Sequence, residues 1–180
     1  MKCDLRDTAF LLIARFDTTV RLENALCVIE FLCTHFDAHI FLWEFDSHNN
    51  GIFERVKPLS VEYRFHEDWD PVLHRTRHIN NMLQHVDERF VAVWDVDVIA
   101  PIEQIVESVN CLREGLDFVY PYACHFCDTS EEIRNMFVGQ PDINLLLRHQ
   151  KFMNESLNNK INKSDINSNN DIYNNNKENK

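Results

Sequence analysis

Two aspartates separated by one residue, Asp95 and Asp97, follow directly after an apolar segment, residues 90–94. Side chains two positions apart on an extended chain point to the same side, so the carboxylates are expected to lie together. Their repulsion is about 1 kcal/mol in water and several times larger at an effective dielectric constant near 20. A divalent cation removes this cost and gains hard oxygen ligands. The pair predicts a Mn²⁺ or Mg²⁺ site suited to a nucleoside diphosphate. The alternative is a turn whose two aspartates are solvated or cap a helix, since short Asp-x-Asp patterns are common by chance.

A basic segment precedes this pair in the chain. Residues 73–83 have helical spacing, which lets Arg75, His78 and Asn80 or Asn81 approach the site of the two aspartates. A guanidinium can donate two parallel hydrogen bonds to a phosphate, which makes Arg75 a candidate phosphate ligand. The alternative is an ordinary solvated helix face.

The elements that must position these residues alternate between apolar and amphipathic segments. Buried strands are expected at residues 9–14, 39–45, 61–65, 90–94 and 118–122. Helices are expected at residues 20–36, from Asp70-Pro71 to about 85, at 102–115, and from 130 to about 152. Thr18 or Thr19 can cap the first helix, and Gly115 closes the third. This order predicts an α/β domain with a mostly parallel sheet, whose ligands bind outside the carboxyl ends of the strands where strand order reverses.

Length and charge limit the class of protein. The 180 residues fit one domain, expected at 1–153, and the net charge of −11 argues against nucleic acid as a partner. The Asn-rich tail, 154–180, carries too little apolar surface to offset chain entropy and is expected to be disordered.

The cysteines and the apolar runs indicate a compartment. The start of the chain has charges where a secretory signal needs an apolar stretch, and its apolar runs are too short to span a bilayer. We therefore expect a cytoplasmic protein without a transmembrane segment, whose six cysteines are free thiols. Peripheral association with a membrane is compatible with this expectation.

Several features together carry a resemblance to a known family. The order of the elements, the segments RTRHIN (75–80) and WDVDVIAP (94–101), and the later FVYPY resemble GT-A glycosyltransferases over about residues 8–137. The nearest likeness is to family-2-type bacterial enzymes of polysaccharide and capsule assembly, in the galactosyltransferase-like branch. The resemblance implies a Rossmann-like three-layer α/β/α fold and transfer of a sugar from a nucleoside diphosphate donor, expected to be a UDP-sugar. The acceptor would be a saccharide or a lipid-linked saccharide.

The resemblance also implies roles for single residues. Residues 14–17 would line the base pocket with Arg15 near it, Glu44 would accept a hydrogen bond from the base, and Asp46 lies beside Glu44. The two acids fit equally well as solvated loop residues.

At the other end of the donor, the resemblance implies a diphosphate and metal site. Arg75 would meet the diphosphate or shape the donor pocket, Asp95 would contact the ribose or the donor sugar and lie beside the metal, and Asp97 would coordinate the Mn²⁺ or Mg²⁺.

One departure from the family concerns the acceptor side. The family places a Gly-rich turn and the acidic catalytic base beyond the fifth strand. Here the chain passes instead into residues 128–152 and the tail. No catalytic base is assigned among Asp128, Glu131, Glu132 and Asp142. The alternative function is therefore a truncated, non-catalytic nucleotide-sugar-binding remnant, or one half of an assembly that another chain completes.

Other chemistries have weaker support in the sequence. A nucleotidyltransferase would show a Gly-rich basic loop after the first strand, which residues 14–21 lack. A phosphatase would carry its aspartate motif after the first strand rather than after the fourth. Cys124 and Cys127 form a CHFC motif, but a structural zinc needs two further ligands at suitable spacing.

Overall fold

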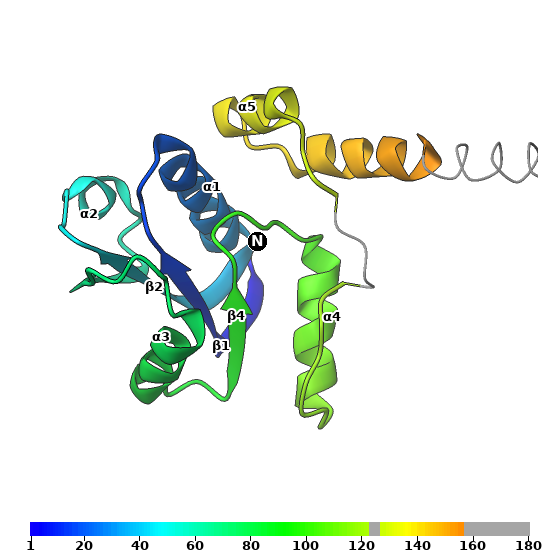
Figure 1. Cartoon of the computed structure of the whole chain (residues 1–180). Helices are drawn as coiled ribbons and strands as arrows, with labels where there is room; N and C mark the ends of the chain where they lie inside the picture. The colour runs from blue at the N-terminus through cyan, green and yellow to red at the C-terminus, as the bar shows by residue number, and fades with distance from the viewer. Residues whose placement is uncertain (123–126, 157–180) are drawn as a thin grey trace, which may run out of the picture. The chain divides into compact units, whose positions relative to one another are not determined.

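The computed structural model describes residues 1–122 and 127–156 of the chain. The chain divides into two compact units, Met1–Cys124 and His125–Lys180. All strands of the described residues belong to the first unit, which carries the predicted site residues (Figure 1).

The first unit is built on a four-stranded sheet in which every neighbouring pair is parallel. The strands are β1 (Cys3–Ala14), β2 (Phe36–Asp46), β3 (Val61–Glu67) and β4 (Phe90–Trp94), in the spatial order β3-β2-β1-β4. This arrangement confirms the predicted α/β class with a parallel sheet. The chain proceeds from β1 to β2 and β3 on one side and then crosses to β4 on the other. The strand order therefore reverses between β1 and β4.

The two central strands are apolar on both faces because helices cover both faces of the sheet. One face packs on helix α3 (Arg75–Met82), through a core cluster that includes Leu11, Phe41, Trp43 and Met82. Side chains alternate between faces along a strand. Phe10, Leu12, Ile40 and Leu42, all almost fully buried, therefore point to the opposite face. Helix α1 (Thr19–His35) covers that face (Figure 1). Each fully buried side chain of this size contributes about 1.5–3 kcal/mol of hydrophobic stabilisation.

Helix boundaries follow local side-chain chemistry. The predicted cap of α1 is confirmed at Thr18, whose Oγ1 accepts a hydrogen bond from the backbone N–H of Arg21 at 3.3 Å. The predicted start of the next long helix at Asp70-Pro71 is wrong, since α3 begins only at Arg75. The carboxylate of Asp70 accepts from the backbone N–H of Val72 at 3.0 Å, and such a side-chain turn competes with a helix.

One further helix of the first unit was not predicted, and the end of another was predicted correctly. A short helix that we did not predict, α2 (Ile52–Val56), follows Gly51, whose φ of +66° suits a residue without a Cβ. Helix α4 (Ile102–Arg113) is followed by Gly115 with a φ of +108°, which confirms the predicted end of this helix.

The predicted fifth strand at residues 118–122 is wrong. No strand forms there, and 68% of Phe118 and 61% of Tyr120 are exposed. The aromatic rings of this segment contact one another instead, with centroids of Phe118 and Tyr120 4.6 Å apart. Pro121 also lacks the N–H that a central strand would donate to its neighbour.

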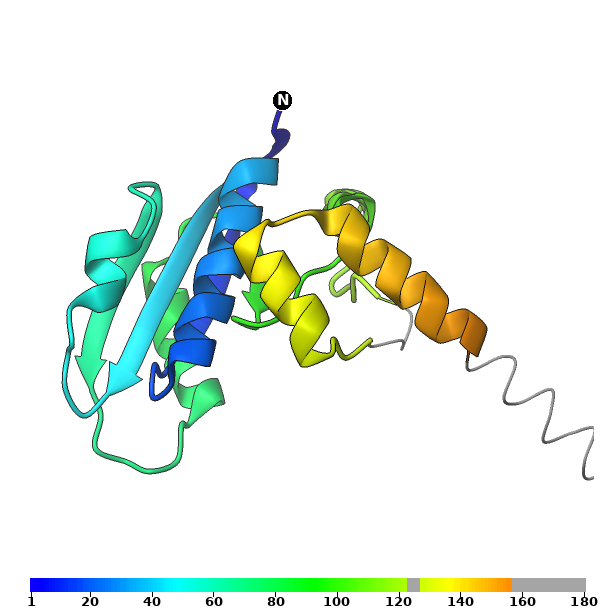
Figure 2. The same cartoon turned by 90° about the horizontal axis from the view of Figure 1, so that it is seen from above.

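The second unit is helical in its described part. Helix α5 (Glu131–Gly139) is capped by Ser130, and a further helix covers residues 143–156 (Figure 2). The single helix predicted from 130 to about 152 is thus interrupted at residues 140–142, where Pro141 removes a backbone donor. The first three residues of the predicted tail, 154–156, continue the helix, and residues 157–180 lie outside the described part of the chain.

No helix within residues 1–122 and 127–156 is both long enough and apolar enough to cross a membrane.

Candidate functional site at the carboxyl edge of the sheet

The parallel sheet brings residues from four distant segments to one edge. β1, β2, β3 and β4 all end at this edge. Asp46 is the last residue of β2, and Arg15, Asp68 and Asp95 directly follow β1, β3 and β4. Ligands of open parallel sheets bind at this edge, where the strand order reverses. In this chain that position lies between the ends of β1 and β4.

Arg75 and Asp95 meet at the β4 end of this edge. The guanidinium of Arg75, in the first turn of α3, forms an ion pair with the carboxylate of Asp95, the first residue after β4. The side chains are 45% and 47% exposed, so a ligand from solvent can reach both charges. The helix and the strand end therefore present opposite charges at a single accessible place.

The loop after β4 differs from the extended geometry that we expected. β4 ends at Trp94, and the backbone N–H of Val98 donates to the carbonyl oxygen of Asp95 at 3.4 Å, which closes a turn. The indole N–H of Trp94 donates to the carbonyl oxygen of Val98 at 2.9 Å and fixes this turn against the strand. Asp97 is exposed within the turn. The extended-chain argument for the common direction of the two carboxylates is therefore wrong, because residues 95–98 turn.

The donor set at this turn suits only some metals. Among the described residues, no group of three or more His, Cys, Asp or Glu side chains is placed to hold a metal ion. Asp95 and Asp97 could supply two carboxylate oxygens. Mg²⁺ and similar hard cations commonly bind through one or two carboxylates and complete their shell with water and phosphate oxygens. Two carboxylates by themselves would suit only a cation that completes its shell with phosphate oxygens and water, rather than a metal held by the protein alone.

The start of α3 forms a hollow of about 260 Å³, lined by His74, Arg75, Thr76 and Arg77. The N-terminus of a helix presents unpaired N–H groups and a partial positive charge, which attract anions. The two arginines add full positive charges. The hollow is therefore chemically suited to phosphate groups.

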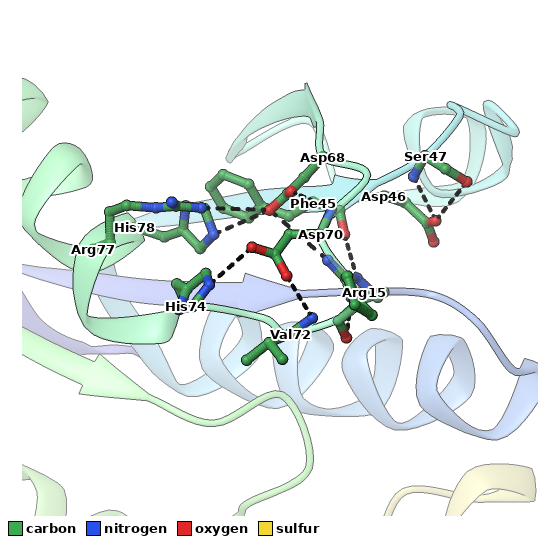
Figure 3. A network of polar contacts seen from close by, with 11 residues as sticks. Arg15, Phe45, Asp46, Ser47, Asp68, Asp70, Val72, His74, Arg77 and His78 are labelled. Atoms are coloured by element: carbon green, nitrogen blue, oxygen red, sulfur yellow. Dashed lines mark hydrogen bonds and ion pairs between the residues drawn. The ribbon is translucent and has the colours of Figure 1, made fainter.

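Arg15 directly follows β1, and its side chain is only 15% exposed. Figure 3 shows its guanidinium reaching across from the end of β1 to the end of β2 and to the loop before α3. Nε donates to the carbonyl oxygen of Phe45 at 2.9 Å, and Nη1 donates to the carbonyl oxygen of Pro71 at 3.2 Å. Arg15, predicted to lie near the base pocket, is thus bound to the backbone of two other segments.

Asp68, whose side chain is 12% exposed, is a residue of the site that we did not predict. Its Oδ1 accepts from the backbone N–H of Asp70 at 2.9 Å, while Oδ2 lies 3.8 Å from Nη2 of Arg15 and 3.4 Å from Nε2 of His78. The motif DWD directly after β3 was the available signal, because acidic residues at strand ends also suggested Asp46 and Asp95.

His78 is 4% exposed and stacks on Phe45, with ring centroids 3.6 Å apart. Burial lowers the pKa of His78, the positive charge of Arg77 lowers it further, and Asp68 opposes both effects. The helix thus directs His78 inward, toward Asp68, while Arg75 one turn earlier stays accessible.

Glu44 lies on the sheet face covered by α1 and is 1% exposed, so it is not a solvated loop acid. Its Oε2 accepts a hydrogen bond from the hydroxyl of Tyr63 at 2.7 Å, and Oε1 is buried without a hydrogen-bond partner. Burial raises the pKa of Glu44, partly opposed by the Tyr63 bond. Asp46, two residues on, accepts at 2.7 Å from the backbone N–H of Ser47.

The remaining candidates lie away from this edge in sequence. Asp128, Glu131, Glu132 and Asp142 belong to the second unit. Cys124 of the CHFC motif lies outside the described residues.

Comparisons with known proteins add no relative. No protein-family model matches the chain, and no curated protein matches its sequence.

Proposed function

We propose that this chain binds a nucleoside diphosphate sugar, with UDP as the nucleotide, between the carboxyl ends of β1 and β4. The observation that carries this proposal is the accessible ion pair of Arg75 and Asp95 beside the arginine-lined hollow of α3. Positive groups for phosphate and carboxylates for a cation lie at one edge, where parallel sheets bind their ligands. The GT-A resemblance supports the same assignment.

The roles of the residues follow from their charges and exposure. Arg75, Arg77 and the first N–H groups of α3 would bind the oxygens of the diphosphate. Asp97 and Asp95 would hold Mn²⁺ or Mg²⁺, and Asp95 would also face the ribose or the donor sugar. When bound, the cation would neutralise charge on the diphosphate as the sugar leaves.

We further propose that the activity is glycosyl transfer to a saccharide or lipid-linked saccharide acceptor. The second candidate is a donor-binding protein without turnover. One observation favours it: the described residues after α4 form no strand and supply no acidic residue that we can assign as a base. Both candidates predict binding of UDP with a cation, and only the first predicts transfer or hydrolysis of a UDP-sugar.

Calorimetry with the full chain tests the shared part of the proposal. UDP is titrated with Mn²⁺, with Mg²⁺ and with excess chelator, into the wild type and Asp97→Ala. We expect binding only with a cation, and we expect Asp97→Ala to remove the difference between cation and chelator. Asp87→Ala, which removes an exposed acid before the start of β4, is the matched control.

Two results separate the possibilities. Equal UDP affinity with cation and with chelator would overturn the cation role. Binding without release of UDP from a UDP-sugar, across a panel of saccharide acceptors, would favour the donor-binding protein over the transferase.

A further inference from the structure

We propose that Arg15 is a positioning residue, which together with Asp68 latches the loop before α3 and so places Arg75 for the diphosphate. This inference rests on the proposed function and deepens it. Arg15 acts on the ligand through Arg75, and does not touch the ligand itself.

The first support is that the guanidinium of Arg15 is already committed to the protein. Nε and Nη1 donate to the backbone carbonyls of Phe45 and Pro71, and the side chain is 15% exposed. The third nitrogen, Nη2, is buried without a hydrogen-bond partner and lies 3.8 Å from Oδ2 of Asp68, so solvent does not reach it. The contacts join β1, the end of β2 and the loop before α3.

The second support is Asp68, which holds the same loop from its other side. The backbone N–H of Asp68 donates to the carbonyl oxygen of Asp46 at 2.9 Å, and its Oδ1 accepts from the N–H of Asp70. Its Oδ2 faces Arg15, His78 and, at 3.9 Å, Nη2 of Arg77. One carboxylate oxygen, the buried Oδ2, thus faces the end of β1 and two positions of α3.

Local contacts connect the loop that Arg15 and Asp68 hold to Arg75. Asp70 lies 2.9 Å from Nε2 of His74, and the N–H of Arg75 donates to the carbonyl oxygen of Leu73 at 2.9 Å. Each residue from the latched Pro71 to the start of α3 is therefore held locally. If Pro71 becomes more mobile, Arg75 becomes more mobile as well, because only this loop separates the two residues.

The start of α3, like those of α2 and α4, has no side-chain cap. His74, the residue before α3, makes no side-chain capping bond to the helix, unlike Thr18 at α1 and Ser130 at α5. A helix start without such a bond frays more readily. The contacts of Arg15 and Asp68 supply the fixation that a cap would otherwise provide.

A double-mutant cycle tests whether Arg15 acts through Arg75. UDP affinity with Mn²⁺ is measured by calorimetry for the wild type, Arg15→Ala, Arg75→Ala and the double variant. Arg15→Ala is expected to weaken binding about tenfold, and to have less than about a twofold effect once Arg75 is already alanine. Arg15→Lys should restore only part of the lost UDP affinity, because an ammonium group cannot donate to the Phe45 and Pro71 carbonyl oxygens in the way that the planar guanidinium does. Arg6→Ala, which removes a 73%-exposed arginine at the start of β1, should bind as the wild type does.

The cycle distinguishes this inference from the proposed function. If the wild type binds UDP and the two losses add, Arg15 acts independently of Arg75 and the inference is overturned. If Arg15→Ala binds as tightly as the wild type, the inference is also overturned, and the proposed site stands. If the wild type fails to bind UDP, the proposed function itself is overturned.

A second measurement needs no ligand and remains informative in that last case. Hydrogen exchange of residues 72–79 is followed in the wild type, Arg15→Ala, Asp68→Asn and Arg6→Ala. We expect the first turn of α3 to exchange at least about fivefold faster in Arg15→Ala and Asp68→Asn, with the amides of β1 and β2 unchanged. Exchange in this segment equal to that of Arg6→Ala would overturn the latch. Uniformly faster exchange, indicating global destabilisation, would also count against it.

Discussion

Arg75 of α3 forms an ion pair with Asp95, the first residue after β4, at the edge of the sheet where the strand order reverses. Both side chains are about half exposed. An exposed pair of this kind contributes only about 0–1 kcal/mol to folding. Its substitution can therefore separate an effect on ligand binding from an effect on stability.

Arg75→Ala is expected to reduce the affinity for UDP with Mn²⁺ by about tenfold or more, since a charge-assisted bond contributes about 1.5–3 kcal/mol. The free energy of unfolding, measured with urea, should change by less than about 1 kcal/mol. Arg89→Ala, a substitution of an exposed arginine just before β4, is the control. Unchanged UDP affinity in a folded Arg75→Ala would refute the phosphate role.

We expect the protein to lose stability in mild acid because His78 is buried in its neutral form. Burial holds the pKa of His78 below the value of about 6.5 that it has in the unfolded chain. Its neutral form therefore supports the fold above that value, and this support is lost as the pH falls below about 6.5 and through the lower folded pKa. His78→Gln should flatten the decline in unfolding free energy between pH 7 and pH 5. His66, whose pKa burial also lowers, leaves part of the slope. A slope as steep as that of the exposed-site control His48→Gln would contradict the prediction.

Removing the Tyr63 hydroxyl, which donates to Glu44, is expected to lower the free energy of unfolding. Tyr63→Phe leaves the buried Oε2 of Glu44 without the hydroxyl that now donates to it. We expect the free energy of unfolding to fall by about 1–3 kcal/mol at neutral pH. Tyr120→Phe, at a position 61% exposed, removes the same atom outside the core and should change stability little. Equal urea midpoints for the two variants would show that the buried bond contributes nothing net.

The charge of Glu44 predicts a gain in stability when it is removed. Since burial raises the pKa of Glu44, its favourable contribution is complete below the unfolded pKa of about 4.3 and is lost as the pH rises through the higher folded pKa. Glu44→Gln should therefore raise the melting temperature at pH 7, and the difference should shrink toward pH 4. Thermal melts at both pH values, compared with those of the wild type, measure this effect.

The same variant tests the proposed contact of Glu44 with the nucleotide base. Oε1 of Glu44 has no hydrogen-bond partner but is buried, so a base could bond to it only if the side chains that cover it moved. Glu44→Gln should then weaken UDP binding several-fold and leave the affinity for inorganic pyrophosphate unchanged. Parallel losses for the two ligands would indicate a structural role for Glu44 instead.

Local pattern predicted the elements where one physical signal dominated. The carboxyl-terminal parts of β1 and β2 and most of α1 were predicted because their apolar spacing matches a buried strand or one helix face, and Thr18 was recognised by its capping chemistry. The two strands begin earlier than predicted, at Cys3 and Phe36. The segment at 118–122 was predicted wrongly because its aromatic residues fit a strand, while strand formation also needs a partner edge. The start of α3 was misplaced because Asp70 and Pro71 suit a turn as well as a helix.

The amino-acid sequence alone determined that this chain forms an α/β fold with a parallel sheet. It also predicts Arg75, Asp95 and Asp97 as residues for one ligand, which stays a prediction. These inferences depend on periodicity and residue chemistry, which are local. Only the tertiary structure decided that Arg75 pairs with Asp95, that Glu44 is buried against Tyr63, and that Asp68 and Arg15 hold the loop before α3. Those contacts depend on which strand ends become neighbours, because parallel pairing joins segments that no local pattern relates.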